Sequence, residues 1–122
     1  MNGNDIVIVS ATRTAIGKFG GQFATTSAIE LGTTVAKAAI QKANLSPEQI
    51  DTVIFGNVLQ AGLGQNPARQ VGLGAGLNHA STAVTINEVC GSGLKAIISA
   101  AQVLRLGDAK IVLAGGMENM SL

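Results

Sequence analysis

Aromatic side chains are nearly absent from this sequence, whose 122 residues include three Phe and neither Trp nor Tyr. Because 47% of the residues are still hydrophobic, we expect a real core, built from Val, Ile, Leu and Ala. Charged residues are also few, at 12%, and the eight basic ones are scattered and leave a net charge of only +1. Without a basic stripe or rings to stack on bases, nucleic acid is not an expected partner.

Cysteine and histidine each occur once, as Cys90 and His79. One Cys cannot close an intrachain disulfide, and one Cys with one His cannot complete a structural zinc site, so we expect no metal. The polar start at residues 1–5 lacks the features of a signal peptide, and no apolar run reaches the roughly 18 residues of a membrane span. We therefore expect a cytoplasmic protein without a membrane partner.

Short apolar runs alternate with helix-like segments along the chain. Runs of β-branched and apolar residues between turn residues predict strands at 6–9, 52–57, 83–86 and 110–114. Capping signals predict helices after Ser27, from Asn66 to about Ala75 and over 93–106, with a single turn after Ser46. The order β-α-β-α-β-α-β predicts an α/β layered fold, with a mostly parallel sheet flanked by helices on both faces, as one domain over residues 1–122.

Two of these helices carry expectations about burial. Ala28, Leu31, Val35 and Ala38 recur at helical spacing and should form the buried stripe of the first helix. The helix over 93–106 is apolar on nearly every side, which is typical of a helix buried all round. Any face of that helix left uncovered would mark an association surface.

Cys90 lies between the predicted strand 83–86 and the long helix, next to Gly91 and close to Gly93. Glycines allow a sharp turn and the close approach of a substrate. The first turn of a helix offers free N–H groups and the positive end of the dipole, which favour a thiolate. This pattern is typical of a nucleophile on a strand-to-helix turn. A lone Cys in an apolar chain is otherwise a small buried hydrophobe, and the pattern leaves both interpretations open.

Five stretches, in order along the chain, resemble the thiolase family. The stretch NEVCGSGLKA at 87–96 is similar to the acyl-accepting cysteine motif of that family. The other stretches are ATRTAIGKFGG at 11–21, FGNVLQAG at 55–62, GQNPARQ at 64–70 and GGMENMS at 115–121. The resemblance covers essentially the whole chain. Within it, the run QAGLGQNPARQ is closer to acetoacetyl-CoA thiolases than to long-chain degradative ones.

The resemblance implies an acyltransferase of the thiolase type, an acetyl-CoA C-acetyltransferase with Cys90 as its catalytic residue. In the family, this cysteine takes the acetyl group of acetyl-CoA as a thioester. A second acetyl-CoA then takes that group up to form acetoacetyl-CoA, and the reverse reaction is thiolysis. Coenzyme A thioesters are thus the implied substrates, and no cofactor is expected. The family also pairs the strand before the nucleophile, here 83–86, across a twofold interface, which implies a homodimer or higher oligomer.

The resemblance is to the first half of a fold that has two similar halves. In the family, a general-base His and a second Cys come from the other half, and neither maps onto this chain. His79 is interpreted as a loop residue. The resemblance therefore implies a truncated thiolase with incomplete activity. The alternatives are a catalytically inactive fragment that only dimerises, and a related ketoacyl synthase, which the CGSGLK and GGMENMS stretches disfavour.

Other polar and glycine-rich features are interpreted as structural. Asn57 and Asn119 lie in motif loops and should hydrogen-bond to the backbone. Lys95 should reach solvent or an ion pair, and Glu88 should be a turn or interface residue. The glycine-rich segment 72–76 does not join a strand to a helix, so it does not indicate a dinucleotide site.

Overall fold

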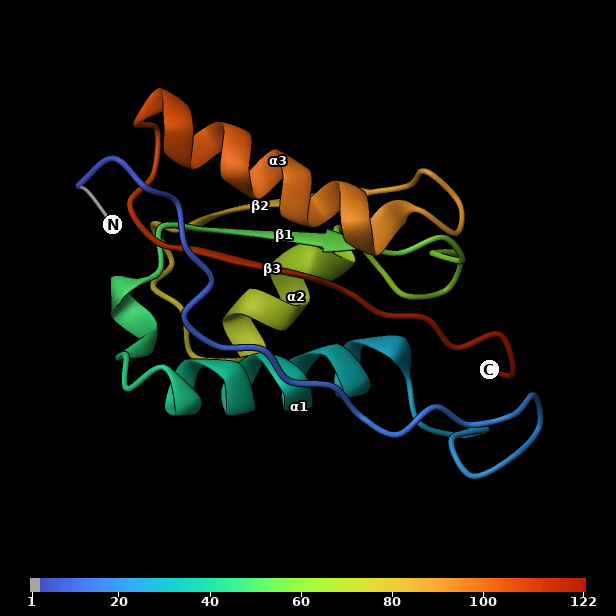
Figure 1. Ribbon diagram of the computed structural model, residues 1–122. Coiled ribbons are helices and arrows are strands. Elements are labelled where there is room, and N and C mark those ends of the chain that lie inside the picture. The colour runs from blue at the N-terminus through green and yellow to red at the C-terminus, as the bar shows by residue number, and fades with distance from the viewer. Residues whose placement is uncertain (1–2) are drawn as a thin grey trace.

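Figure 1 shows the computed structural model of the chain, which describes residues 3–122 and leaves Met1 and Asn2 outside the described part. The elements, in order, are α1 (Ala28–Lys42), the 3-10 turn η1 (Pro47–Gln49), β1 (Thr52–Gly56), α2 (Pro67–Gly74), β2 (Thr82–Ile86), α3 (Ser92–Leu106) and β3 (Val112–Gly116). All predicted elements except the first strand are therefore present, close to their predicted bounds.

The three strands form one parallel sheet in the order β2-β1-β3. Thr52 of β1 lies opposite Thr82 on one side and Val112 on the other, and both registers continue to the ends of the strands. Helix α3 packs on one face of the sheet and α2 on the other, with α1 outside α2 (Figure 1). The predicted α/β layered fold with a parallel sheet is confirmed, with three strands in the sheet instead of four.

Strand β1 forms the centre of the core, since all of its residues are buried. Its side chains alternate between the two faces of the sheet. Val53 and Phe55 join the larger hydrophobic cluster on the side of α1 and α2, whereas Ile54 packs with Ala96 and Ala100 of α3. The expected core of Val, Ile, Leu and Ala is present, but the largest fully buried side chain is that of Phe55.

The helix starts agree with the capping signals. Ser27 and Glu30 form the predicted capping box of α1, with side-chain-to-backbone hydrogen bonds of 2.7 and 3.1 Å. Ser46 precedes η1, and its hydroxyl donates to the Glu48 carboxylate, which lowers the pKa of this exposed carboxyl group. Asn66 caps α2 through its side-chain oxygen. These local signals were sufficient because each involves residues only a few positions apart.

The buried face of α1 consists of Ala28, Gly32, Ala36 and Ile40. The predicted stripe is wrong beyond its first residue, because Leu31 and Val35 are half-buried and Ala38 is exposed. Helix α1 packs closely on α2, and this requires a small residue at the contact. An added Cβ at Gly32 would lie 3.0 Å from a methyl carbon of Val71. Hydrophobic spacing misplaced the face because it gives glycine no weight.

The predicted strand at 6–9 is absent, and these residues pair with no strand among the described residues. The central strand β1 has no free edge with which residues 6–9 could pair, since it already pairs with β2 and β3. The chain is held against α1 directly afterwards. There the Ser10 hydroxyl donates to Ala39 O at 2.7 Å, and the Thr12 hydroxyl donates to Val35 O at 2.9 Å.

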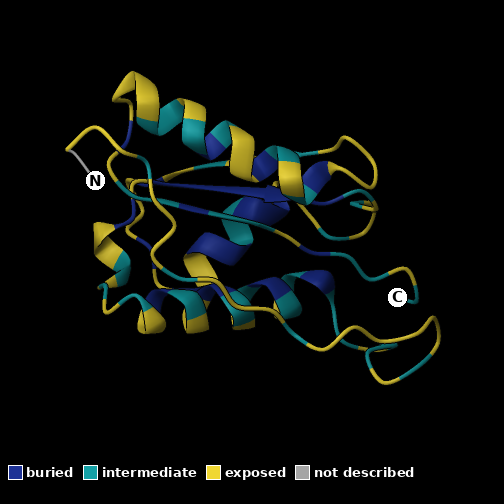
Figure 2. Ribbon diagram, viewed as in Figure 1, coloured by how far each residue is buried: buried dark blue, intermediate teal, exposed yellow. Residues whose placement is uncertain are grey.

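The prediction of a helix buried on every side is wrong for α3. Its inner residues Ala96 and Ala100 pack in the core, whereas Leu94 is 66% exposed and Ile97 and Ile98 are each 44% exposed. Figure 2 shows exposed residues along the length of α3. The reason is that the described residues cover α3 from one side only. We call the exposed side, Leu94 with Ile97 and Ile98, the α3 outer face.

Residues 89–106 are long and apolar enough, by length and composition, to cross a membrane, with a mean hydropathy of 1.2. Lys95 and Arg105 interrupt this segment, so it is not one continuous apolar run. Core helices of soluble proteins can have the same length and composition. In this structure the segment includes α3, whose inner residues pack on the sheet.

Candidate active site

Cys90 lies between the end of β2 and the start of α3, as predicted from the sequence. The residue is exposed and its thiol is free, so the interpretation of Cys90 as a small buried hydrophobe is wrong. Gly91 is the N-cap of α3, and the helix begins at Ser92. Cys90 therefore directly precedes the amino end of a helix of 15 residues, and such an end carries the positive pole of the helix dipole.

The chain reverses sharply through residues 87–92, which we call the Cys90 turn. Val89 has a φ of +53°, in the left-handed region that β-branched residues rarely adopt. The side-chain oxygen of Asn87 accepts a hydrogen bond from Val89 N–H at 2.9 Å. Gly91 N–H donates to Glu88 O at 3.2 Å. The turn thus combines an unfavourable backbone conformation with several short-range hydrogen bonds.

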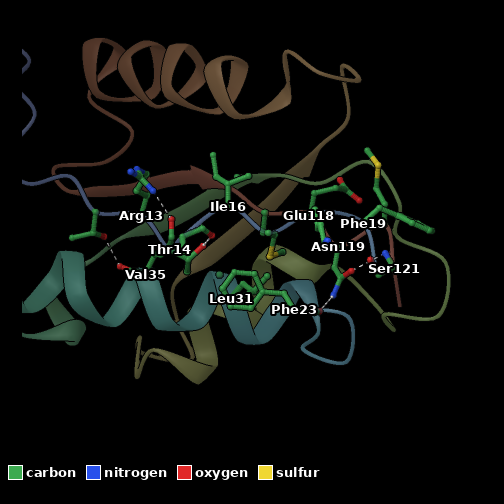
Figure 3. Close-up of a pocket in the computed structure, with 18 residues that line it drawn as sticks. Arg13, Thr14, Ile16, Phe19, Phe23, Leu31, Val35, Glu118, Asn119 and Ser121 are labelled. Atoms are coloured by element: carbon green, nitrogen blue, oxygen red, sulfur yellow. Dashed lines mark hydrogen bonds between the residues drawn. The ribbon is translucent and has the colours of Figure 1, made fainter. Parts of the chain in front are cut away.

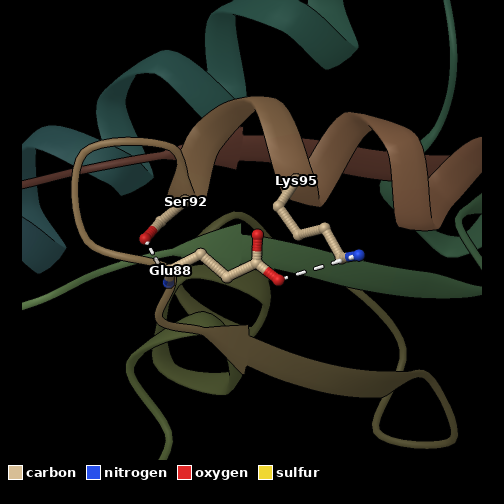
Figure 4. A network of polar contacts seen from close by, with 3 residues as sticks. All are labelled: Glu88, Ser92 and Lys95. Atoms are coloured by element: carbon tan, nitrogen blue, oxygen red, sulfur yellow. Dashed lines mark hydrogen bonds and ion pairs between the residues drawn. The ribbon is translucent and has the colours of Figure 1, made fainter.

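Ser92 is the buried polar residue of the Cys90 turn, with only 4% of its surface exposed. Its hydroxyl donates to Val89 O at 2.6 Å and accepts from Glu88 N–H at 2.8 Å. Figure 4 shows Ser92 reaching back to the Glu88 backbone. One hydroxyl therefore binds the two residues that precede Cys90.

The first turn of α3 lies directly on the carboxyl ends of β1 and β3. An added Cβ at Gly56 would be 2.5 Å from the carbonyl carbon of Ser92, and one at Gly116 would be 3.2 Å from the Cα of Gly93. Glycine at these strand ends is what permits this approach. Cys90 is thereby placed at the carboxyl edge of a parallel sheet, the edge at which open α/β folds bind their ligands.

Glu88 and Lys95 form an ion pair across the Cys90 turn, with 3.7 Å between Oε1 and Nζ (Figure 4). This confirms the predicted ion pair of Lys95 and the location of Glu88 in a turn. Both side chains are more than a third exposed, at 56% for Glu88 and 38% for Lys95. Water therefore screens the pair, and its contribution to stability is small.

Glu118, in the C-terminal stretch 115–121, ties β3 to the loop after β1. Its carboxylate accepts hydrogen bonds from Val58 N–H at 2.8 Å and from Leu59 N–H at 3.1 Å. Asn57 donates from Nδ2 to Met117 O at 3.1 Å, which confirms its predicted bond to the backbone. Sequence reasoning missed the role of Glu118, because its partners are about 60 positions away.

The end of the same stretch holds the N-terminal loop. Asn119 donates from Nδ2 to Phe23 O at 2.7 Å and also to Thr26 O, again as predicted for a loop asparagine. The Ser121 hydroxyl accepts a hydrogen bond from Gly20 N–H at 2.8 Å. A cavity of about 520 Å³ lies between these segments and α1. Figure 3 shows the side chains that line it. Cys90 does not line this cavity, which is therefore separate from the Cys90 turn.

The stretch 64–70 supports β2 from the side of α2. Asn66, in the left-handed region, accepts a hydrogen bond from the Thr85 hydroxyl at 2.7 Å and donates to Ala83 O at 3.2 Å. Arg69 donates to the carbonyl oxygens of Ser81 and His79 in the loop before β2. His79 is a loop residue, as predicted, and lies at the end of β2 opposite to Cys90.

The family model for the thiolase N-terminal domain matches residues 6–122. The chain belongs to the thiolase family. It is 60% identical over 116 residues to an acetyl-CoA acetyltransferase of Escherichia coli strain K12, a match that covers 95% of this chain and 29% of that protein. It is 54% identical over 116 residues to the cytosolic acetyl-CoA acetyltransferase of Mus musculus, with coverage of 95% and 29%.

A solved thiolase structure matches the fold closely. The Acat5 thiolase from Ascaris suum, crystallised in complex with coenzyme A, gives a TM-score of 0.92 at 46% identity over 93% of this chain and 30% of that one. The thiolase fold expected from the sequence is thereby confirmed for this chain. The chain spans less than a third of the length of these thiolase relatives.

Proposed function

We propose that Cys90 is the acyl-accepting nucleophile of an acetyl-CoA acetyltransferase of the thiolase type. The observation that carries the proposal is an exposed thiol at the amino end of α3, within a chain 60% identical to an enzyme of that name. A coenzyme A complex of a related thiolase supports coenzyme A thioesters as the substrate class. These thioesters are substrates, and the proposal requires no resident cofactor.

The proposed reaction begins when the Cys90 thiolate attacks the carbonyl carbon of acetyl-CoA. The C–S bond to coenzyme A breaks, coenzyme A leaves as a thiol after taking up a proton, and the acetyl group remains on Sγ. A second acetyl-CoA, after losing an α-proton, attacks that acetyl carbon through its own α-carbon. Acetoacetyl-CoA leaves and the thiolate is restored, and the reverse sequence is thiolysis.

Full turnover also needs a base for the α-proton. His79, the only histidine of the sequence, lies before β2, whereas Cys90 follows β2, so the strand separates them. Thiolase resemblance assigns the base and a second cysteine to regions of the family that this chain does not match. We therefore propose acylation of Cys90 as the reaction of this chain, and complete acetyl transfer only together with such regions.

Association is part of the proposed function. Among the described residues β2 is an edge strand, and Val84 on it is 50% exposed, which supports the twofold pairing that the resemblance implies for 83–86. The α3 outer face supplies a second apolar surface for protein contact.

The cytosolic names of the mouse and rat relatives support a cytoplasmic location.

The direct test is the intact mass of the purified chain after incubation with acetyl-CoA. We expect one acetyl group per chain, which is absent in Cys90→Ala and is released by free coenzyme A. Circular dichroism establishes that both proteins are folded. A folded chain that takes up no acetyl group, or one that is acetylated equally after Cys90→Ala, contradicts the proposal.

A non-catalytic module that only associates is the second candidate, and the exposed α3 outer face favours it. Sedimentation velocity on the same samples separates the two. Dimerisation without acetylation supports the association module, whereas acetylation at Cys90 supports the enzyme.

A further inference from the structure

The Cys90 turn contains a residue whose conformation requires an explanation. Val89 is 65% exposed and has a φ of +53°. For a β-branched residue this conformation costs free energy, and it persists only where surrounding contacts determine it. Because the Val89 side chain is mostly in solvent, its packing does not hold the backbone of Val89 in this conformation.

The turn is held by the Asn87 side chain, which accepts from Val89 N–H, by backbone hydrogen bonds, and by two bonds of the Ser92 hydroxyl. This hydroxyl accepts a hydrogen bond from Glu88 N–H at 2.8 Å and donates one to Val89 O at 2.6 Å. Glu88 N–H precedes the φ and ψ bonds of Val89 along the backbone, and Val89 O follows them. The Ser92 hydroxyl therefore restrains the backbone on both sides of these two rotations. Ser92 itself is fixed, since it is buried beside Gly56 at the end of β1.

We propose that Ser92 is the positioning residue of Cys90. Its hydroxyl holds Val89 in the left-handed conformation, and this conformation sets the direction in which the next residue leaves the turn. Cys90 is thereby kept exposed at the amino end of α3. This inference rests on the proposed function for the role of Cys90 as a nucleophile, but the positioning of Cys90 can be measured without any acyl transfer.

The experiment measures the rate at which iodoacetamide alkylates Cys90 in the folded full chain, followed by intact mass. Ser92→Ala should slow this rate about tenfold, which corresponds to the loss of one or two part-buried hydrogen bonds. Ser10→Ala is the matched control, because it also removes a hydroxyl that donates to a backbone carbonyl, but on α1. Its alkylation rate should equal that of the wild type.

A rescue experiment separates positioning from general stability. Glycine enters the left-handed region without a steric cost, so Val89→Gly removes the need for the Ser92 hydroxyl. In the Val89→Gly background, Ser92→Ala should slow alkylation by less than about threefold. An equal loss in both backgrounds, or no loss in either, overturns the proposal.

One measurement needs no variant, so the proposal stays testable if Ser92→Ala fails to fold. Glu88 is exposed, yet its amide is bonded to the Ser92 hydroxyl, so its hydrogen exchange should be at least about tenfold slower than in an unstructured chain. Exchange at the unstructured rate overturns the proposal. Failure of acetylation while the alkylation pattern holds would refute the proposed function alone.

Discussion

Both ends of the parallel sheet are tied by a carboxylate that accepts backbone hydrogen bonds, but the two ends differ in what surrounds that carboxylate. At the amino end, Asp51 accepts from Lys110 N–H at 2.7 Å and from Ile111 N–H at 3.1 Å. At the carboxyl end, half-buried Glu118 accepts from Val58 N–H and Leu59 N–H. Each carboxylate joins β1 or its flanking residues to β3 or its flanking residues.

The difference lies in the backbone. The amino end places an exposed carboxylate on ordinary extended chain, with no left-handed residue beside it. The carboxyl end brings α3 against Gly56 and Gly116 and keeps Val89 left-handed beside Cys90. Close approach and backbone strain are typical of functional sites, and in parallel sheets these lie at the carboxyl ends. The amino end of the sheet therefore contributes to stability, whereas the carboxyl end forms the candidate site.

The largest expected effect is that of Gly56→Ala, which tests the close approach at the carboxyl end. The new Cβ would lie 2.5 Å from the carbonyl carbon of Ser92 and 2.7 Å from the amide nitrogen of Gly93. Backbone atoms cannot rotate away, so α3 must shift. We expect the free energy of unfolding, measured by urea denaturation, to fall by about 3 kcal/mol.

Gly3→Ala is the matched control for this substitution, because no atom of the described residues lies within 4 Å of a Cβ added there. Its free energy of unfolding should stay within about 0.5 kcal/mol of the wild type. If Gly56→Ala is as stable as Gly3→Ala, α3 does not rest on the end of β1 in solution.

Glu118→Ala should have an intermediate effect, because it leaves two backbone N–H groups without their acceptor. A partly buried donor without a partner costs about 1–3 kcal/mol, and we expect a loss of about 2 kcal/mol in the free energy of unfolding. Glu118→Gln keeps one acceptor oxygen and should lose less. Glu48→Ala, which removes an exposed carboxylate, is the control and should change little. Equal urea midpoints for the Glu118 and Glu48 variants would contradict the assigned role of Glu118.

Local sequence signals were sufficient for most of the fold. The capping residues Ser27 and Asn66 gave the starts of α1 and α2, and the strand–Cys–Gly pattern gave the turn at Cys90. The exposure of α3 and the unpaired segment 6–9 were not predictable in the same way. Hydrophobicity states which residues favour burial, but it does not state whether another element is available to cover them.

The site was predictable only at Cys90 itself. The bonds of Ser92 to the residues before Cys90 depend on a buried hydroxyl whose direction follows from the way α3 rests on β1. The bonds of Glu118 to Val58 depend on the pairing of β1 with β3. The hydrogen bonds of Ser92 and of Glu118 are thus consequences of tertiary packing. They cannot be predicted from the order of residue types until the packing of α3 and the strands is known.

The smallest expected effect belongs to the amino end of the sheet. Hydrogen bonds from Lys110 N–H and then Ile111 N–H hold the pKa of the Asp51 carboxyl group below its ordinary value of 3.8. Since the folded pKa is lowered, the contribution of Asp51 to stability is complete above about pH 4 and is lost as the pH falls through the folded value. The wild-type urea midpoint should therefore decline more steeply below pH 4 than that of Asp51→Asn, which cannot titrate. Because Asp51 is exposed, the difference should be small and should shrink further in salt, as is expected for a group screened by solvent. If the urea midpoints of the two proteins decline equally below pH 4, the amino end of the sheet is held by backbone pairing alone. Only the carboxyl end of the sheet would then depend on its carboxylate.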